Sequence, residues 1–201
     1  GITPQDDSFL SKKRWDIAGT PREHFPLLLH YHPLVLYRHQ VCKQADALLA
    51  YYLFPGEHER ELMERSYDYY EEITTHDSSL SVCVFSILAT RLGQMEKAYR
   101  YFRRTVRVDL DDTHGNTKDG LHMANMGGSY LCVLGGFARL VFDDAGLSLS
   151  PVLPGGWRSY RFRFLYRGSV FEVDVTGEGT AVTRISGEPR EIMVDGEVKV
   201  Y

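Results

Sequence analysis

The period of the hydrophobic residues changes near Phe142, and this change constrains the fold more than any other feature of the sequence. Before it, apolar residues such as Leu80, Val84 and Ile87 recur at the spacing of an amphipathic helix. After it, apolar and polar residues alternate, as in the stretch FEVDV at 171–175, which is the pattern of a strand. The sequence therefore predicts a mainly α region over residues 1–141, followed by a small antiparallel β sheet or sandwich over residues 142–201.

Short breaks divide the first region into successive helices. Pro55 and Gly56 end one helical pattern, and Gly93 stands where a helix C-terminus favours a left-handed residue. On the last helix Met126 and Tyr130 are expected to face inward. The pattern predicts antiparallel helical hairpins, with helices at about 39–53, 57–73, 80–92, 95–107 and 123–140.

Two β-hairpins are predicted in the second region. The dipeptide at 167–168, Arg-Gly, separates two alternating stretches and marks the first turn. The dipeptide at 195–196, Asp-Gly, lies between two more alternating stretches and is strongly favoured in a type I′ turn. Both hairpins belong to the predicted β region.

The composition argues against several classes of partner. Lys plus Arg number 23 and Asp plus Glu 27, so a formal charge of -4 provides no field that would attract nucleic acid or an acidic membrane. No apolar run approaches the roughly 20 residues of a membrane span. Cys42, Cys83 and Cys132 lie in apolar patterns, and an odd number without paired spacing favours buried, reduced thiols and a cytoplasmic protein.

The stretch THDSSLS, residues 75–81, places dense polarity where an apolar helix begins. Asp77 or Ser78 could cap that helix by accepting a hydrogen bond from a free backbone N–H group. The two serines and the exposed N–H groups at the positive end of the helix dipole would also suit a phosphate group. The stretch argues against a serine hydrolase, because the consecutive His76, Asp77 and Ser78 cannot line up with one another as base, orienter and nucleophile.

Two further polar stretches precede or begin predicted helices. In HGNTKDGLHMANMGG, residues 114–128, His122 lies near a helix start without partners at metal-ligand spacing, so neither a metal site nor a cofactor is predicted. In HQVCKQADALLAYY, residues 39–52, the pattern places Lys43 and Gln44 on a helix near its N-terminus. A lysine there opposes the helix dipole and requires either solvent or a nearby anion.

Taken jointly, these stretches resemble the C-terminal part of glycoside hydrolase family 65, the family of maltose, trehalose and kojibiose phosphorylases. The resemblance extends in order along almost the whole chain and is highly specific, although each motif alone would be weak. It is carried by QDDSFL, YRHQVCKQADALLAYYLF, THDSSLS, AYRYFRRTVRVDLDDTHGNTKDGLHMANMGG and PVLPGGW.

The resemblance implies part of an (α/α)6 barrel followed by a C-terminal β domain. It also implies an inverting phosphorolysis, in which inorganic phosphate, a co-substrate rather than a cofactor, cleaves an α-linked glucose disaccharide to β-glucose 1-phosphate and a free sugar. By similarity to the family motif, Ser78, Ser79 and His122 would contact phosphate, whereas Lys43 and Gln44 would contact glucose. The implied partners are the two substrates, the N-terminal portion of the same enzyme and, in a homodimer, a second copy.

The resemblance places the family's general-acid glutamate in a segment that precedes everything in this chain. We therefore expect the chain alone to be inactive, because the leaving oxygen would lack its proton donor. Two alternatives remain open at this point. One is a family 65 hydrolase that uses water, and the other is a non-catalytic helical and β fragment whose polar turns are only caps.

Overall fold

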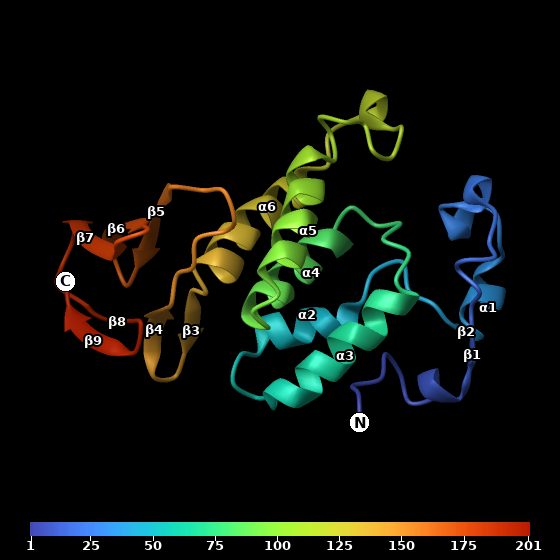
Figure 1. Cartoon of the computed structure of the whole chain (residues 1–201), viewed down its shortest axis with the longest axis horizontal. Coiled ribbons are helices and arrows are strands. Elements are labelled where there is room, and N and C mark those ends of the chain that lie inside the picture. Colours follow the sequence, from blue (N-terminus) through green and yellow to red (C-terminus); the bar gives the residue numbers. More distant parts are fainter.

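The computed structural model describes residues 1–201, with the helices in the centre, the β region at one end and the N-terminal segment at the other (Figure 1). No helix is both long and apolar enough to cross a membrane. The longer helices are α2 (Asp46–Leu53), α3 (Arg60–Ile73), α4 (Ser81–Arg91), α5 (Met95–Arg107) and α6 (Met123–Leu131), which continues as a π-helical segment (Cys132–Phe137). The short elements are α1 (Pro33–Leu36) and the 3-10 turns η1 (Phe9–Ser11), η2 (Arg22–His24), η3 (Leu27–Leu29) and η4 (Thr117–Asp119).

Helix α4 is the centre of the helical region. Its sequence SVCVFSILATR is apolar on nearly all sides, and nine of its residues are buried. A helix that is hydrophobic all round must be covered on every side. Helices α2, α5 and α6 provide that cover.

Helices α2, α4 and α6 run parallel to one another. Along α4, Cys83 approaches Gly128 near the start of α6, and Ile87 approaches Gly136 further along the same helical segment. The carbonyl of Cys42, which precedes α2, accepts a hydrogen bond at 2.8 Å from the N–H of Thr75, which precedes α4. Near the other end, Arg91 of α4 donates to the carbonyl of Tyr51 in α2 at 3.0 Å. The N-termini of all three helices therefore lie at one end of the molecule.

Helices α3 and α5 return the chain in the opposite direction. Arg60, at the start of α3, donates to the carbonyl of Arg91, at the end of α4, at 3.0 Å, and Tyr67 further along α3 lies against Phe85 near the start of α4. Ser86 of α4 donates to the carbonyl of Ala98 in α5 at 2.9 Å. Both returning helices are amphipathic, with charged residues on their outer faces. The predicted antiparallel hairpins are thus present.

The β region contains two sheets. Strands β5 (Ser159–Tyr166), β6 (Ser169–Thr176) and β7 (Gly179–Ser186) form an antiparallel sheet, and both predicted hairpins are present. Arg167 and Asp195 have φ of 46° and 51°, and the glycine that follows each also has a positive φ, as a type I′ turn requires. The second sheet, β3 (Val141–Asp143), β4 (Gly146–Leu149), β8 (Glu191–Val194) and β9 (Glu197–Val200), departs from the prediction because β4 and β8 are parallel.

One hydrophobic core joins the helical and β regions. Trp157, between the two regions, packs its ring edge-on against Phe102 of α5 and against Phe137, with ring centroids 5.7 Å apart in each case. Tyr160 of β5 continues the contact on the other side of Trp157, at 5.9 Å. Most buried apolar residues of both regions belong to a single cluster, so the β region is packed on the helices.

Two details of the helix prediction are wrong. The helix predicted from residue 39 begins at Asp46, because His39 and Gln40 form β2 and pair in parallel with β1 (Lys13–Arg14). The Gln40 side chain donates to the carbonyls of Leu10 and Lys12, and these long-range bonds override the local helical pattern. On α6, Met126 and Tyr130 are exposed, whereas the small residues Asn125 and Gly128 are buried against neighbouring helices.

Candidate active site

The turn before α4 is shaped by His76. This residue has a φ of 58°, an uncommon value for a residue with a side chain. Its Nδ1 lies 2.8 Å from the Ser81 hydroxyl, and its ring packs edge-on against Phe85 at 4.8 Å between centroids. Burial, with a smaller contribution from the positive charge of Arg104, lowers the pKa of His76 to about 4. A neutral imidazole therefore holds the turn in place.

The two capping candidates in this turn play different parts. Asp77 does not cap α4, because its Oδ2 accepts from the Leu27 N–H at 2.9 Å and so joins the turn to η3. Ser78 does not cap α4 either, because its hydroxyl oxygen accepts from the N–H of Leu80, the residue just before the helix, at 3.3 Å and so closes the preceding turn. Its O–H remains able to donate to a ligand. The Ser79 side chain has no hydrogen-bond partner and lines a cavity.

His122 is held by one carboxylate from the preceding loop. Asp109 Oδ1 lies 2.5 Å from His122 Nδ1, and Oδ2 accepts from the His122 N–H at 3.0 Å. The hydrogen bond from His122 is the largest of the effects that lower the pKa of Asp109. With Nδ1 engaged in this way, Nε2 is the ring atom left for a ligand.

His114 packs against His122 and lines a cavity together with Ser79. Its ring centroid is 5.6 Å from that of His122. Burial, followed by the charge of His122, lowers the pKa of His114. The cavity has a volume of about 430 Å³, and we call it the arginine cavity because its walls include Arg100, Arg103, Arg104 and Arg107 of α5. Sequence reasoning missed these arginines and His114.

Lys43 and Gln44 lie in the turn before α2 and not on a helix, which corrects the sequence prediction. Lys43 is exposed, and Gln44 Nε2 donates to Asp46 at 2.8 Å. Both line a second cavity, of about 320 Å³, which is separate from the arginine cavity. We call it the N-terminal cavity, and its other polar walls include Asp6, Lys12 and Asp77.

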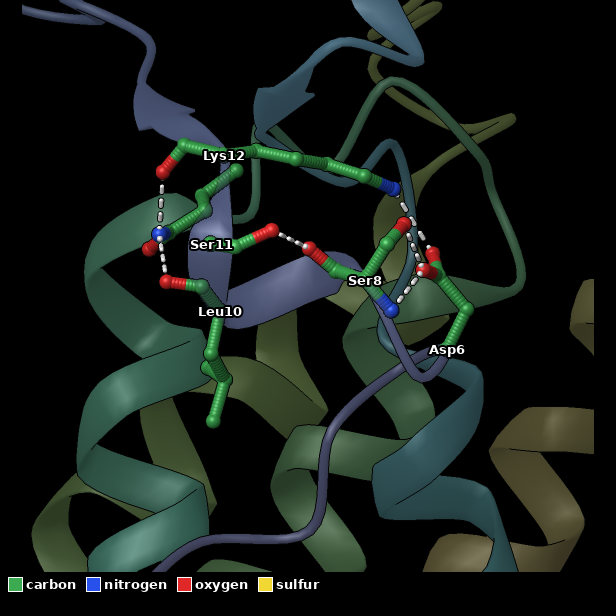
Figure 2. Close-up of polar contacts among 6 residues, drawn as sticks. Asp6, Ser8, Leu10, Ser11 and Lys12 are labelled. Atoms are coloured by element: carbon green, nitrogen blue, oxygen red, sulfur yellow. Dashed lines mark hydrogen bonds and ion pairs between the residues drawn. The ribbon is translucent and has the colours of Figure 1, made fainter.

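The motif QDDSFL shapes the N-terminal cavity, although sequence reasoning assigned it no site residue. Asp6 accepts from the N–H and the hydroxyl of Ser8, and its other oxygen lies 2.8 Å from the Lys12 ammonium (Figure 2). These bonds, that of Lys12 first, lower the pKa of Asp6. Gln5 accepts from the Ala47 N–H at 3.2 Å and thereby caps α2 from outside.

The predicted residues thus fall into two neighbouring groups at the shared N-terminal end of α2, α4 and α6. The bridge between Cys42 and Thr74 ties the turn that carries Lys43 to the turn that carries Ser78 and Ser79. His122, at the start of α6, joins this end through His114. Three helix N-termini add partial positive charge there, which favours an anion.

Comparison with known proteins identifies the family of the chain. The model of the glycosyl hydrolase family 65 central catalytic domain matches residues 1–131, and that of the family 65 C-terminal domain matches residues 140–200. An alpha,alpha-trehalose phosphorylase of Geobacillus stearothermophilus is 57% identical over 196 residues, which are 98% of this chain and 26% of that protein.

Two other relatives extend the comparison. A maltose phosphorylase of Bacillus subtilis is 35% identical over 96% of this chain and 26% of its own length. A solved structure assigned as a kojibiose phosphorylase, from the human microbiome, superposes with a TM-score of 0.88 at 29% identity and covers 98% of this chain and 26% of its own. The chain spans about a quarter of the length of these relatives. On this evidence the chain belongs to glycosyl hydrolase family 65.

Proposed function

We propose that the chain is the C-terminal part of an inverting disaccharide phosphorylase, which cleaves an α-glucosidic bond with inorganic phosphate to give β-glucose 1-phosphate and a free sugar. The observation that carries the proposal is the convergence of Lys43, Ser79 and His122 at one end of three parallel helices. Trehalose and maltose phosphorylases among the relatives support it.

In this proposal Ser78, Ser79 and His122 hold the attacking phosphate. A dianion must be gathered beside the anomeric carbon, which requires donors that are already oriented. Ser78 has a free O–H, Ser79 has no internal partner, and His122 has a free Nε2 because Asp109 occupies Nδ1. Lys43 and Gln44, in the N-terminal cavity, would contact the glucose unit.

Helices α2, α4 and α6 would form part of the inner ring of an (α/α)6 barrel, with α3 and α5 in the outer ring. The buried, apolar α4 and the amphipathic α3 and α5 are what inner and outer helices require. The general-acid glutamate and the remaining helices would belong to the rest of the enzyme, which would be the partner of this chain.

The carboxylate that holds His122 is not available as a base for a water nucleophile. A water molecule would need a free carboxylate as its base. Asp109 is engaged by the ring and the N–H of His122, and Asp77 is engaged by the Leu27 N–H. Both oxygens of Asp109 are therefore occupied, whereas Asp77 Oδ1 has no hydrogen-bond partner, so a hydrolase would have to use Asp77 as its base.

A chimera tests the proposal. This chain would replace the matching segment of the Geobacillus stearothermophilus trehalose phosphorylase, where the two are 57% identical. We expect phosphate-dependent release of glucose 1-phosphate from trehalose, maltose or kojibiose, and we expect the release to be lost in a Ser78→Ala, Ser79→Ala double variant. Release of glucose without phosphate would instead identify a hydrolase, and no reaction in a folded chimera would favour a non-catalytic chain.

A further inference from the structure

The arginine cavity carries more positive charge than its own carboxylates neutralise. Arg100, Arg103, Arg104 and Arg107 are spaced so that they share one face of α5. The carboxylates among the lining residues are Glu96 and Asp111. Four guanidinium groups against two carboxylates leave two positive charges in one concave surface.

Only one of the four arginines forms an ion pair. Arg107 binds Asp111 through Nε at 2.7 Å and through a second nitrogen at 2.5 Å. Arg100 and Arg104 lie over the Tyr101 ring, with 5.7 and 6.0 Å between guanidinium carbon and ring centroid. Arg103 has no hydrogen bond, ion pair or ring contact. Several exposed arginines elsewhere are paired, as Arg14, Arg161 and Arg163 are with acidic residues.

The cavity shares Ser79 with the proposed serine and histidine site and extends beyond it along α5. Ser79, His76 and His114 form one of its walls, whereas Ser78 and His122 do not line it. Burial lowers the pKa of both wall histidines most, and the charge of Arg104 adds to the effect, after that of His122 in the case of His114. The arginine-rich part follows α5 away from the turn.

We propose that the arginine-lined part of this cavity is a second binding site for a phosphate group, which borders the site of Ser78, Ser79 and His122 at Ser79. The planar fork of an arginine matches two phosphate oxygens, and two unneutralised positive charges match a dianion. A volume of about 430 Å³ admits a phosphate group with an organic substituent, and Tyr99 provides an aromatic wall for that substituent. Both free phosphate and a phosphate monoester such as glucose 1-phosphate carry the required chemistry.

Phosphate bound in this cavity would be held beside the Ser79 turn, from which it could pass to the proposed reaction site. Only this supply of phosphate to the reaction rests on the function proposed above. Binding itself does not depend on that function. A failed binding test would therefore leave the phosphorylase proposal standing, and an inactive chimera would leave the binding proposal standing.

Titration of the 201-residue chain with inorganic phosphate and with glucose 1-phosphate, by calorimetry at constant ionic strength, tests the proposal. We expect the double variant Arg103→Gln, Arg104→Gln to bind both phosphate and glucose 1-phosphate about tenfold or more weakly than the parent chain. The matched control is Arg22→Gln, because Arg22 is exposed, unpaired and outside the cavity. Glucose and chloride serve as ligands that lack the dianion.

A Ser78→Ala, His122→Ala double variant separates the two sites, because neither residue lines the cavity. Binding that persists in this variant and is lost in the arginine variant supports the proposal. Tighter binding of glucose 1-phosphate than of phosphate would assign the site to the monoester, and equal binding would assign it to the phosphate group alone.

Three results would overturn the proposal. They are unchanged binding in the arginine variant, loss of all binding in the Ser78 and His122 variant, and tighter binding of a hexaglutamate peptide than of either phosphate. The last result would assign the surface to an acidic polypeptide segment. Far-UV circular dichroism of each variant confirms that a loss of binding is not a loss of folding.

Discussion

Replacing Gly128 with alanine would test the close packing of α6 on α4 that places His122. A Cβ atom at Gly128 would lie 2.8 Å from the Cys83 sulfur and 3.0 Å from its Cβ, whereas at Gly127 it would meet nothing within 4 Å. Both glycines lie within α6, so each substitution gains about the same helix propensity, roughly 0.8–1 kcal/mol. The difference in the free energy of unfolding between the two variants therefore reports the cost of the contact between the added methyl group and Cys83.

We expect Gly127→Ala to stabilise the chain by up to about 1 kcal/mol, because it meets only solvent. Gly128→Ala should be less stable than Gly127→Ala by about 1–3 kcal/mol, the usual cost of an added methyl group in a packed interior. The Cys83 thiol donates to the Leu80 carbonyl at 3.1 Å, so its displacement also disturbs the turn that carries Ser79.

Urea unfolding followed by circular dichroism measures the free energy of unfolding of each variant. The two values can be compared if the free energy falls with urea concentration at the same slope in both variants. A second substitution, Cys83→Ala, removes the obstructing sulfur and should recover part of the loss in the Gly128 variant, which a double-mutant cycle would detect. Equal stability of the Gly127 and Gly128 variants would refute the inferred contact between the helices.

The remaining predictions concern the proposed chemistry and the pH response. In the chimera, Ser79→Ala should raise the Michaelis constant for phosphate about tenfold or more through loss of a hydrogen bond to a charged group, while that for the disaccharide changes little. His122→Ala should depress reaction with both phosphate and arsenate, and parental rates with either anion would contradict its role. The unfolded chain binds a proton at His76 more readily than the folded chain, so the free energy of unfolding should fall as the pH is lowered from about 6.5 to about 4. His76→Asn, which tolerates a positive φ, should remove that part of the pH dependence, as measured by urea unfolding at each pH. The 201-residue chain alone should release no glucose 1-phosphate from trehalose, maltose or kojibiose, because we expect its general acid in another segment.

Much of the fold could be predicted from the sequence because its signals are local. The turns at Arg167 and Asp195 depend on a glycine beside each residue, and Gly93 ends its helix region with a φ of 82°. By contrast, β2 depends on bonds from Gln40 to Leu10 and Lys12, which lie about thirty residues away. No periodicity within residues 39–52 could reveal those bonds.

The site shows the same division between local and distant information. The serines before α4 are visible in the sequence because a dense polar stretch directly precedes an apolar helical pattern. The carboxylate that holds His122 comes from Asp109, across a loop whose path the sequence does not specify. The arginine stripe on α5 could have been found from its spacing, but the cavity it lines could not, because His114 and Ser79 come from other segments.

The positions of Lys43, Ser78 and His122 follow from the helical hairpins themselves. Successive members of this set are about 40 residues apart, which is the length of two helices with their turns. Each returning helix, α3 or α5, brings the chain back so that the next inner helix starts at the same end as the last. Residues just before α2, α4 and α6 therefore lie at the same end of the helical region, although they are far apart in sequence. A donor group placed at each of these starts adds to the partial charge of its helix, and three such starts concentrate the charge that a phosphate dianion needs.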